Sequence, residues 1–242
     1  MTHFGTLWGV GVGPGDPQLI TFKAARIVQR SVVVAYVVDD NGNSYARQAA
    51  AEHIPASACE VPLHFSMSPR REERLVARAN AARQVEEILS TGQDVTFITE
   101  GDPLLFSTFQ HLLATLPPAV PVKVCPGVSA LTACAADACF SMAVEDEQML
   151  VATAGAATLQ QLSDWLEMFD VVVLFKVHRY AAALRDAMQD NRLLDRAVLV
   201  QRASLSGQAQ VVELADWDGS PLPYFTTLLI RVRRPVCVEF LA

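Results

Sequence analysis

The residues most able to do chemistry lie in two short turns that share the tripeptide Gly-Asp-Pro. The first turn, residues 11–17, reads GVGPGDP, and the second, residues 100–103, reads EGDP. Glycine tolerates positive φ angles and lets a ligand approach bare backbone. In each turn the Asp can cap a following helix, and Pro suits the first helical position. The two turns therefore predict either a ligand-binding backbone or two well-capped helix starts.

The first turn departs from the common phosphate-binding patterns. Its glycines do not complete G-x-G-x-x-G in either frame, because Pro14 and Asp16 stand where the third glycine belongs. Pro14 also removes an amide that a phosphate would need. No Gly-Lys-Ser/Thr follows, so the P-loop pattern fails too. These departures argue against a nicotinamide-dependent oxidoreductase and predict a ligand other than pyrophosphate.

The elements around the turns follow a regular order. Residues 7–12 and 94–99 have the apolar runs of buried strands, and residues 18–29 and 104–116 have apolar side chains at helical spacing. The β-branched run 31–38 is typical of a strand covered on both faces, as in a parallel sheet. Strands and helices alternate, so the sequence predicts an α/β fold with a doubly wound sheet.

A long helix is predicted in the middle of the first half of the chain. It opens at residues 68–69 and stops at Gly92, and Ser44 caps a shorter helix before it. Arginines make the long helix the most basic segment of the chain, either as a solvated face or as a contact for a carboxylate-rich ligand. Its predicted buried stripe consists of Leu75, Ala79, Ala82, Val85 and Leu89.

The pattern changes after about residue 141. No further long helix is predicted at the end of the chain, where 209–214 and 226–232 read as antiparallel strands. We therefore predict two α/β domains, residues 1–141 and 142–242, the second with a mixed sheet. The other elements predicted in it are strands 148–153, 170–176 and 196–201 and helices 158–168 and 180–189.

Composition narrows the class of protein. The chain has 242 residues, 51% of them hydrophobic, with a mean hydropathy of +0.25, which is enough for a well-filled core. Its apolar runs are far shorter than the roughly 20 residues of a membrane span, and its first residues lack the basic start of a signal peptide. We expect a cytoplasmic protein. The net charge of −7 argues against a nucleic-acid partner.

The metal-binding residue types are scattered. The five cysteines form no Cys-x-x-Cys and the five histidines show no His-x-x-x-His spacing, so we expect no metal site in the protein itself. A disulfide framework is also not expected. The cysteines are Cys59, Cys125, Cys134, Cys139 and Cys237.

Four motifs together resemble the tetrapyrrole methyltransferases, class III enzymes that use S-adenosylmethionine. They are GVGPGDP at 11–17, AY at 35–36, EGDPL at 100–104 and PGVSA at 126–130, in the family's order and covering nearly the whole chain. Three further segments, 44–46, 63–68 and 175–179, are most similar to the precorrin-2 or cobalt-factor II C20-methyltransferases. The resemblance implies two α/β domains with the active site in the cleft between them, and a homodimer.

The resemblance also implies a set of cofactor contacts. Six lie on the motifs themselves, and the last three rest on looser matching of the second half of the chain. Backbone groups in these turns would hydrogen-bond S-adenosylmethionine, or its product S-adenosylhomocysteine. The residues are Pro14, Gly101, Asp102, Leu105, Ser129, Ala130, Phe175, Ala203 and Thr227.

Methyl transfer from a sulfonium needs positioning rather than a covalent nucleophile. A carboxylated macrocycle needs cations, and Arg pairs carboxylates bidentately. We nominate Arg70, Arg71, Lys176 and Arg179 for the substrate arms; the last two directly follow a buried strand, where an α/β sheet presents ligands. Candidates to take the proton from the methylated carbon are Tyr36, His64, Glu100 and Asp102, with water as an alternative.

Other functions stay open at this point. Within the family the substrate could be another corrin ring position, uroporphyrinogen III, diphthine or a ribose of ribosomal RNA, although the acidic charge speaks against RNA. Outside it, a non-catalytic tetrapyrrole carrier and an NAD-dependent oxidoreductase are the alternatives. Binding without turnover would indicate the carrier, and tight nicotinamide binding the oxidoreductase.

Overall fold

The computed structural model describes residues 3–66, 68, 70–156, 158–205, 207 and 209–233. The chain forms two compact units, the first ending at Ala130 and the second beginning at Leu131. Both are α/β units, which confirms the predicted fold class. The expected boundary after residue 141 differs from this division, because helix α5 (Ala130–Asp137) packs Ala133 and Cys134 against the second sheet.

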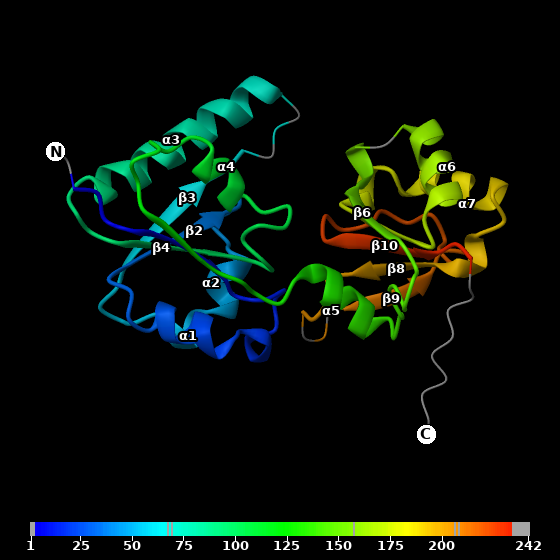
Figure 1. Ribbon diagram of the computed structural model, residues 1–242, viewed down its shortest axis with the longest axis horizontal. Helices are drawn as coiled ribbons and strands as arrows, with labels where there is room; N and C mark the ends of the chain where they lie inside the picture. Colours follow the sequence, from blue (N-terminus) through cyan, green and yellow to red (C-terminus); the bar gives the residue numbers. More distant parts are fainter. Residues whose placement is uncertain are drawn as a thin grey trace. The chain divides into compact units, whose positions relative to one another are not determined.

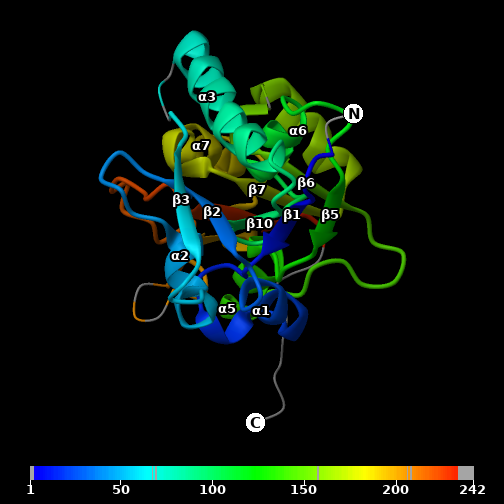
Figure 2. The same ribbon diagram turned by 90° about the vertical axis from the view of Figure 1, so that its left-hand side faces the viewer.

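The first unit is built on a parallel sheet with the strand order β3-β2-β4-β1-β5. Figure 2 shows these strands side by side, with helices above and below them. In the register of β1 and β4, Gly11 is the partner of Thr99, so the two Gly-Asp-Pro turns leave the sheet from adjacent strand ends. The strands are β1 (Leu7–Gly11), β2 (Val33–Val38), β3 (Cys59–His64), β4 (Val95–Thr99) and β5 (Val122–Cys125).

Helices cover both faces of this sheet. In Figure 1, α3 and α4 lie on one face and α1 and α2 on the other. Each face has its own apolar core, one around Phe97 and Phe109 and one around Val10 and Ile98. The helices are α1 (Phe22–Val28), α2 (Tyr45–Ala49), α3 (Arg71–Leu89) and α4 (Phe109–Leu113), with 3-10 turns η1 (Pro17–Leu19) and η2 (Ala51–His53).

Helix α3 is buried along only part of its length. Ala82, Val85 and Leu89 are in the core as expected, but Leu75 is 48% exposed and Ala79 is also exposed, so that part of the predicted stripe is wrong. A helix of 19 residues is about 28 Å long, whereas the strands beneath it have five or six residues and span about 17–20 Å. The amino-terminal half of α3 therefore extends past the sheet.

The helices after the two Gly-Asp-Pro turns begin later than the sequence predicts. Helix α1 begins at Phe22 rather than at residue 18, and the side chain of Thr21 caps it by accepting from the Ala24 amide at 3.1 Å. Asp16 caps only the 3-10 turn η1. Helix α4 begins at Phe109 rather than at residue 104. The expectation that each Asp caps a long helix is therefore wrong, because irregular turns intervene.

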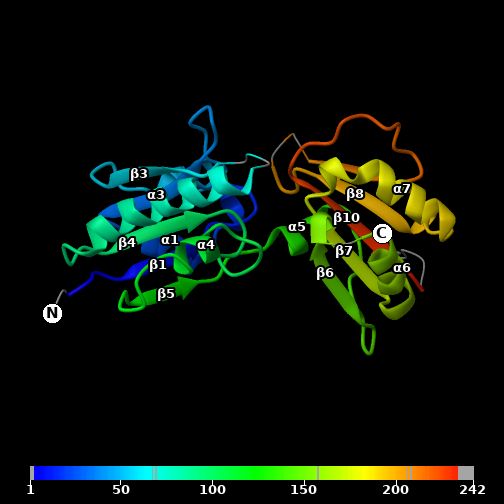
Figure 3. The same ribbon diagram turned by 90° about the horizontal axis from the view of Figure 1, so that it is seen from above.

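The second unit contains a mixed sheet with the strand order β6-β7-β10-β8-β9. Strands β6 and β7 are parallel, whereas β10 is antiparallel to β7 and β8, and β9 is antiparallel to β8. Figure 3 shows β6, β7, β10 and β8 next to one another, with α6 and α7 labelled beside them. The strands are β6 (Met149–Thr153), β7 (Val171–Phe175), β8 (Ala197–Gln201), β9 (Gln210–Glu213) and β10 (Thr226–Arg231).

The core of the second unit lies on both sides of its sheet. Leu162 and Leu166 of α6 (Leu159–Met168) and Leu184 and Met188 of α7 (Ala181–Asp190) pack on one apolar cluster, and α5 packs on the other. Three 3-10 turns complete the unit: η3 (Ala154–Ala156), η4 (Val177–Arg179) and η5 (Leu194–Arg196).

A buried ion pair fixes the start of the second sheet. Arg231 of β10 lies 2.7 Å from the Glu147 carboxylate and donates to the backbone carbonyls of Ser141 and Met142. Both side chains of the pair are less than a tenth exposed. These contacts hold the segment before β6 against the last described strand.

Candidate functional site

Three glycines from distant parts of the sequence meet where β1, β4 and β5 end. A Cβ atom on Gly11 would lie 2.7 Å from the amide nitrogen of Gly127 and would press on the Gly101 carbonyl oxygen. A Cβ atom on Gly127 would lie 2.8 Å from the Gly11 Cα. Real side chains do not approach backbone this closely, so two members of this glycine junction (Gly11, Gly101 and Gly127) require glycine for want of space, and the third, Gly101, is favoured by its φ of 65°.

Backbone hydrogen bonds join the two Gly-Asp-Pro turns directly. The Gly101 amide donates to the Gly13 carbonyl at 2.8 Å, which forms an isolated antiparallel bridge, and the Val12 amide donates to the Thr99 carbonyl at 3.0 Å. Gly13 and Gly101 have φ angles of 85° and 65°, in the region that glycine adopts without strain. The two turns therefore form one backbone surface.

Asp102 ties this surface to a third turn, at residues 126–130. Its Oδ1 accepts from the Leu104 amide at 2.8 Å, and its Oδ2 accepts from the Gly127 amide at 3.1 Å. A Cβ on Gly101 would lie 3.6 Å from the Ala130 nitrogen and 3.8 Å from the Ser129 Cα, which is ordinary contact. The structure thus brings together Gly101, Asp102, Ser129 and Ala130, all nominated from the sequence.

The other two nominated residues of this unit lie on the same turns. Pro14 directly follows Gly13 and is half-buried. Leu105 is 38% exposed, and its amide donates to the Asp102 carbonyl at 3.3 Å. An exposed apolar side chain beside bare glycine backbone is suited to cover an apolar part of a ligand.

Glu100 precedes Gly101 and is held from the other side by helix α2. The Ala46 amide donates to its Oε1 at 3.0 Å. Burial raises the pKa of the Glu100 carboxyl above its usual range, and the backbone amides of Glu100 and Ala46 counter only part of this rise. Glu100 is therefore a carboxyl group that can hold a proton next to the glycine junction. The sequence nominated Glu100 but did not show its contact with α2.

Tyr36, another nominated proton acceptor, belongs to a polar cluster between β2, β3 and α2. Arg47 donates to both oxygens of Glu60, at 2.7 and 3.0 Å. Burial is the main cause that raises the pKa of the Tyr36 hydroxyl; the hydrogen bond and the charge of Glu60 add to it, and Arg47 opposes it. Arg47 and Glu60 were not nominated, because only the pairing of β2 with β3 brings them together.

The four nominated proton acceptors do not form one group. Glu100 and Asp102 flank Gly101, while Tyr36 lies in the Arg47–Glu60 cluster. His64 is exposed at the end of β3, opposite Val38. Both oxygens of Asp102 already accept from backbone amides. Of the four candidates, Glu100 alone combines a raised carboxyl pKa with a position beside the glycine junction.

Three nominated cofactor contacts of the second unit also come together. Phe175 and Thr227 are partners in the register of β7 and β10, and Ala203 packs in the same apolar cluster as Phe175. Burial raises the pKa of the Cys134 thiol to about 11, and a hydrogen bond with Thr227 partly offsets this shift. The edge formed by the ends of β7, β8 and β10 is therefore apolar and closely packed.

The nominated substrate cations differ in their surroundings. Arg70 is 80% exposed and lies 3.1 Å from Glu73, and Arg71 is exposed at the start of α3. Lys176 adopts a left-handed conformation with φ 60° after β7, and its Nζ lies 5.8 Å from the centre of the Tyr224 ring. Arg179 is exposed.

An aromatic cluster that the sequence did not indicate surrounds Lys176. The His178 ring meets Tyr224 edge-on at 5.3 Å, and Tyr224 meets Phe225 at 5.2 Å. Burial lowers the pKa of His178, and the positive charge of Arg179 lowers it further. Tyr224 lies in a loop without periodic spacing, so only the tertiary structure could find this cluster.

The described ranges of the chain were compared with the requirements of a metal site and of a membrane-spanning helix. In them, no cluster of three or more His, Cys, Asp or Glu side chains could hold a metal ion. No helix in the same ranges combines the length and apolar character needed to cross a membrane. Cys237 lies outside the described residues.

The sequence profile of the Tetrapyrrole (Corrin/Porphyrin) Methylases matches residues 6–216. This range contains both units' sheets up to β9 and every nominated site residue except Thr227. The chain belongs to this family.

In alignments with curated relatives, about three aligned residues in ten are identical. The chain is 33% identical over 238 residues to the cobalamin biosynthesis protein CobIJ of Mycobacterium tuberculosis, covering 95% of this chain but 46% of that protein. It therefore spans about half the length of that relative. It is 29% identical over 234 residues to the precorrin-2 C(20)-methyltransferase of Sinorhizobium sp, and 30% over 229 residues to the cobalt-precorrin-2 C(20)-methyltransferase of Salmonella typhimurium. The last two alignments cover 93–94% of this chain and 95–96% of those proteins.

Solved structures share the fold. The cobalt precorrin-4 methyltransferase CbiF superposes with a TM-score of 0.69 at 18% identity, over 93% of this chain and 94% of that one. The uroporphyrin-III C-methyl transferase of Thermus thermophilus, complexed with S-adenosyl homocysteine, gives 0.64 at 22% identity, over 94% and 98%.

Proposed function

We propose that this chain is an S-adenosylmethionine-dependent C-methyltransferase that methylates C20 of precorrin-2 or cobalt-factor II in cobalamin biosynthesis. The glycine junction carries the proposal, because it joins three turns at the carboxyl ends of a parallel sheet, where α/β folds bind ligands. Two relatives aligned over nearly their whole length are named as C(20)-methyltransferases, one of precorrin-2 and one of cobalt-precorrin-2.

The cofactor would be held by the turns rather than by charged side chains. Gly101 lies in ordinary contact with Ser129 and Ala130, so the ligand would meet the backbone of these turns, and Pro14 and Leu105 supply apolar surface beside it. Phe175, Ala203 and Thr227 are proposed as contacts from the second unit. That the cofactor lies in a cleft between two domains stays a prediction from the resemblance.

The bound cofactor supplies a methyl group that is already activated, so the chain's task is to bind, orient and remove a proton. Lys176 and Arg179, with Arg70 and Arg71, would pair with the carboxylate arms of the substrate. When the new carbon–carbon bond forms and the sulfur–methyl bond breaks, the methylated carbon must lose a proton. Glu100 is the proposed acceptor, since its surroundings favour the protonated carboxyl.

Calorimetric titration with S-adenosylhomocysteine tests the cofactor site. We expect one-to-one binding at micromolar concentration or tighter, and loss of at least about 10-fold in affinity for Gly101→Leu, because the added side chain would displace Ser129 and Ala130, which already lie at contact distance. Gly219→Leu is the matched control, since Gly219 also has a positive φ and nothing within 4 Å. Equal binding by both variants would refute the site.

Mass spectrometry of substrates tests the reaction. We expect precorrin-2 or cobalt-factor II to gain one methyl group. Gain of a methyl on uroporphyrinogen III, diphthine or another corrin intermediate would keep the family and change the substrate. Tetrapyrrole binding without any methyl gain would indicate a carrier, and tight NAD binding an oxidoreductase.

Location and assembly belong to the same proposal. A biosynthetic enzyme with a small-molecule substrate is expected in the cytoplasm, and the family resemblance suggests a homodimer. Cell fractionation and sedimentation velocity of the purified protein test these two expectations.

A further inference from the structure

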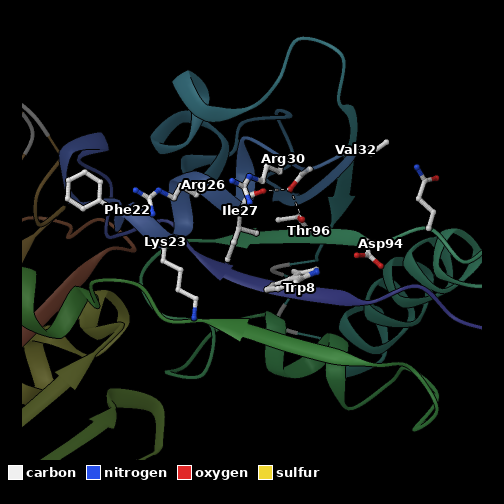
Figure 4. A pocket seen from close by; sticks show the side chains of 11 residues that line it. Trp8, Phe22, Lys23, Arg26, Ile27, Arg30, Val32, Asp94 and Thr96 are labelled. Carbon is white, nitrogen blue, oxygen red and sulfur yellow. Dashed lines mark hydrogen bonds between the residues drawn. The ribbon is translucent and has the colours of Figure 1, made fainter.

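A basic groove lies on the face of the first sheet that α1 covers, apart from the glycine turns. Its cavity has a volume of about 620 Å³, within the range of small-molecule sites. Trp8, Asp94 and Thr96 line it from the amino-terminal halves of β1 and β4 or just before them, whereas the glycine turns follow the carboxyl ends of these strands. Figure 4 shows Trp8 and Thr96 on the sheet side, with Lys23 and Arg26 projecting from α1.

The groove carries an excess of unpaired positive charge. Lys23, Arg26 and Arg30 line it, and in the described ranges no carboxylate lies within ion-pair distance of any of the three. The single acid that lines it, Asp94, accepts from the Thr6 amide at 2.6 Å. Outside the lining, Lys123 lies against one of its residues, with its Nζ 4.8 Å from the centre of the Trp8 ring. In a chain with a net charge of −7, this is a local reversal of sign.

Apolar surface accompanies the charge. Phe22 is 88% exposed and Val32 is 63% exposed at the groove, and Trp8 and Ile27 are partly buried in it. Large apolar side chains beside several cations match a ligand that has both a broad apolar body and several anionic groups. A simple anion would use the cations but leave the apolar surface in water.

We propose that this groove is a second binding site for a polycarboxylated tetrapyrrole, separate from the site of methyl transfer. Lys23 and Arg26 are three residues apart on α1, and Arg30 follows in the next turn, so their charges are spread along the groove. A macrocycle with several carboxylate arms can meet more than one of them at once, while its ring covers Trp8 and Val32. The proposal rests on the proposed function, in which the substrate is itself a polycarboxylated tetrapyrrole.

Binding of uroporphyrin III, a stable polycarboxylated porphyrin, tests the groove. We expect the wild-type chain to bind two molecules and the Lys23→Gln/Arg26→Gln/Arg30→Gln variant to bind one, with loss of at least about 10-fold in affinity for the second site. Raising the salt concentration is expected to weaken porphyrin binding at the groove of the wild-type chain. It should have less effect on the porphyrin binding that remains in the variant. The control variant, Arg83→Gln/Arg185→Gln/Arg192→Gln, removes the same charge outside the groove and should bind two.

The outcomes separate this inference from the proposed function. Unchanged porphyrin binding by the groove variant would overturn the groove site. A change in sedimentation of the groove variant would also overturn it, by indicating an interface between copies of this chain. The affinity for S-adenosylhomocysteine should be the same for the groove variant and the wild-type chain. If neither protein binds S-adenosylhomocysteine, the proposed function is rejected. The groove site would then still be decided by porphyrin binding.

Discussion

The two Gly-Asp-Pro turns have the same local structure but different tertiary roles. In each, one Asp oxygen accepts from the amide two residues on, at 2.8 Å for both Asp16 and Asp102. The second oxygen of Asp102 also accepts from the Gly127 amide, whereas Asp16 makes no such contact with another turn among the described residues. Both turns are joined by backbone hydrogen bonds, but only the Asp side chain of the second turn also holds the turn after β5.

This difference shows why identical tripeptides need not share a function. The Asx-type bond depends only on neighbouring residues, so both turns form it. The bond from Asp102 to Gly127 depends on the adjacency of the β4 and β5 ends to β1, which the sheet order creates. The following variants test how far the two turns differ, beginning with the largest effect.

The glycine junction should be the most sensitive position. Gly127→Ala places a methyl group against the Gly101 and Gly11 backbones, and we expect the free energy of unfolding to fall by about 3 kcal/mol in urea denaturation. Gly42→Ala is the control: its φ is 81° but nothing lies within 4 Å, so about 1 kcal/mol of conformational strain is expected. Equal losses would show that the junction is not tightly packed.

Removal of the Asp side chains should separate the two turns directly. Asp102→Ala leaves the Leu104 and Gly127 amides without their acceptor, and we expect a loss of about 2–3 kcal/mol. Asp16→Ala leaves only the Gln18 amide and should cost about 1 kcal/mol. Urea denaturation of both variants measures the difference. A larger loss of unfolding free energy for Asp16→Ala than for Asp102→Ala would contradict the difference inferred between the two turns.

Glu100 should make stability depend on pH. Because its pKa is raised in the folded state, the folded protein binds more protons than the unfolded chain above the unfolded pKa of about 4.5. The stability of the wild type should therefore fall as the pH rises from that value to the folded pKa, by at most about 1.4 kcal/mol per pH unit from this group.

The variant Glu100→Gln should lose this part of the pH dependence, since its amide oxygen can still accept from the Ala46 amide. Urea denaturation from pH 5 to 8 compares the two proteins, and parallel curves would contradict the assignment. Glu60→Gln is a control, because Arg47 lowers the pKa of Glu60, so that its stabilising charge is constant above about pH 5. This variant should lower the free energy of unfolding without changing its slope between pH 5 and 8.

The smallest effect concerns the true cap of α1. Thr21→Ala should reduce the free energy of unfolding by about 1 kcal/mol, because it removes the acceptor for the Ala24 amide. Thr21→Ser keeps the hydroxyl and should restore most of the stability. An unchanged free energy of unfolding for Thr21→Ala would contradict this prediction. It would indicate that the first turn, rather than the Thr21 hydroxyl, stabilises the start of α1.

The sequence by itself determined the class of fold and the type of turn. Apolar runs such as 31–38 and 171–175 identified buried strands, because their pattern reflects burial on both faces. The family motifs at 11–17, 100–104 and 126–130 identified the family that the profile match confirms. These features are local or are carried by contiguous residues, so they can be seen without knowing the chain's path.

Only the tertiary structure decided which residues meet. The sheet order places Gly11, Gly101 and Gly127 in contact, although they are far apart in sequence. The packing of α2 beside β2 and β3 brings Arg47 to Glu60. The tertiary structure also decided that α1 and α4 begin late and that the amino-terminal half of α3 is exposed, since packing against strands of limited length sets how much of a helix is buried. Contacts between strand ends depend on sheet order, and a one-dimensional pattern does not contain that order.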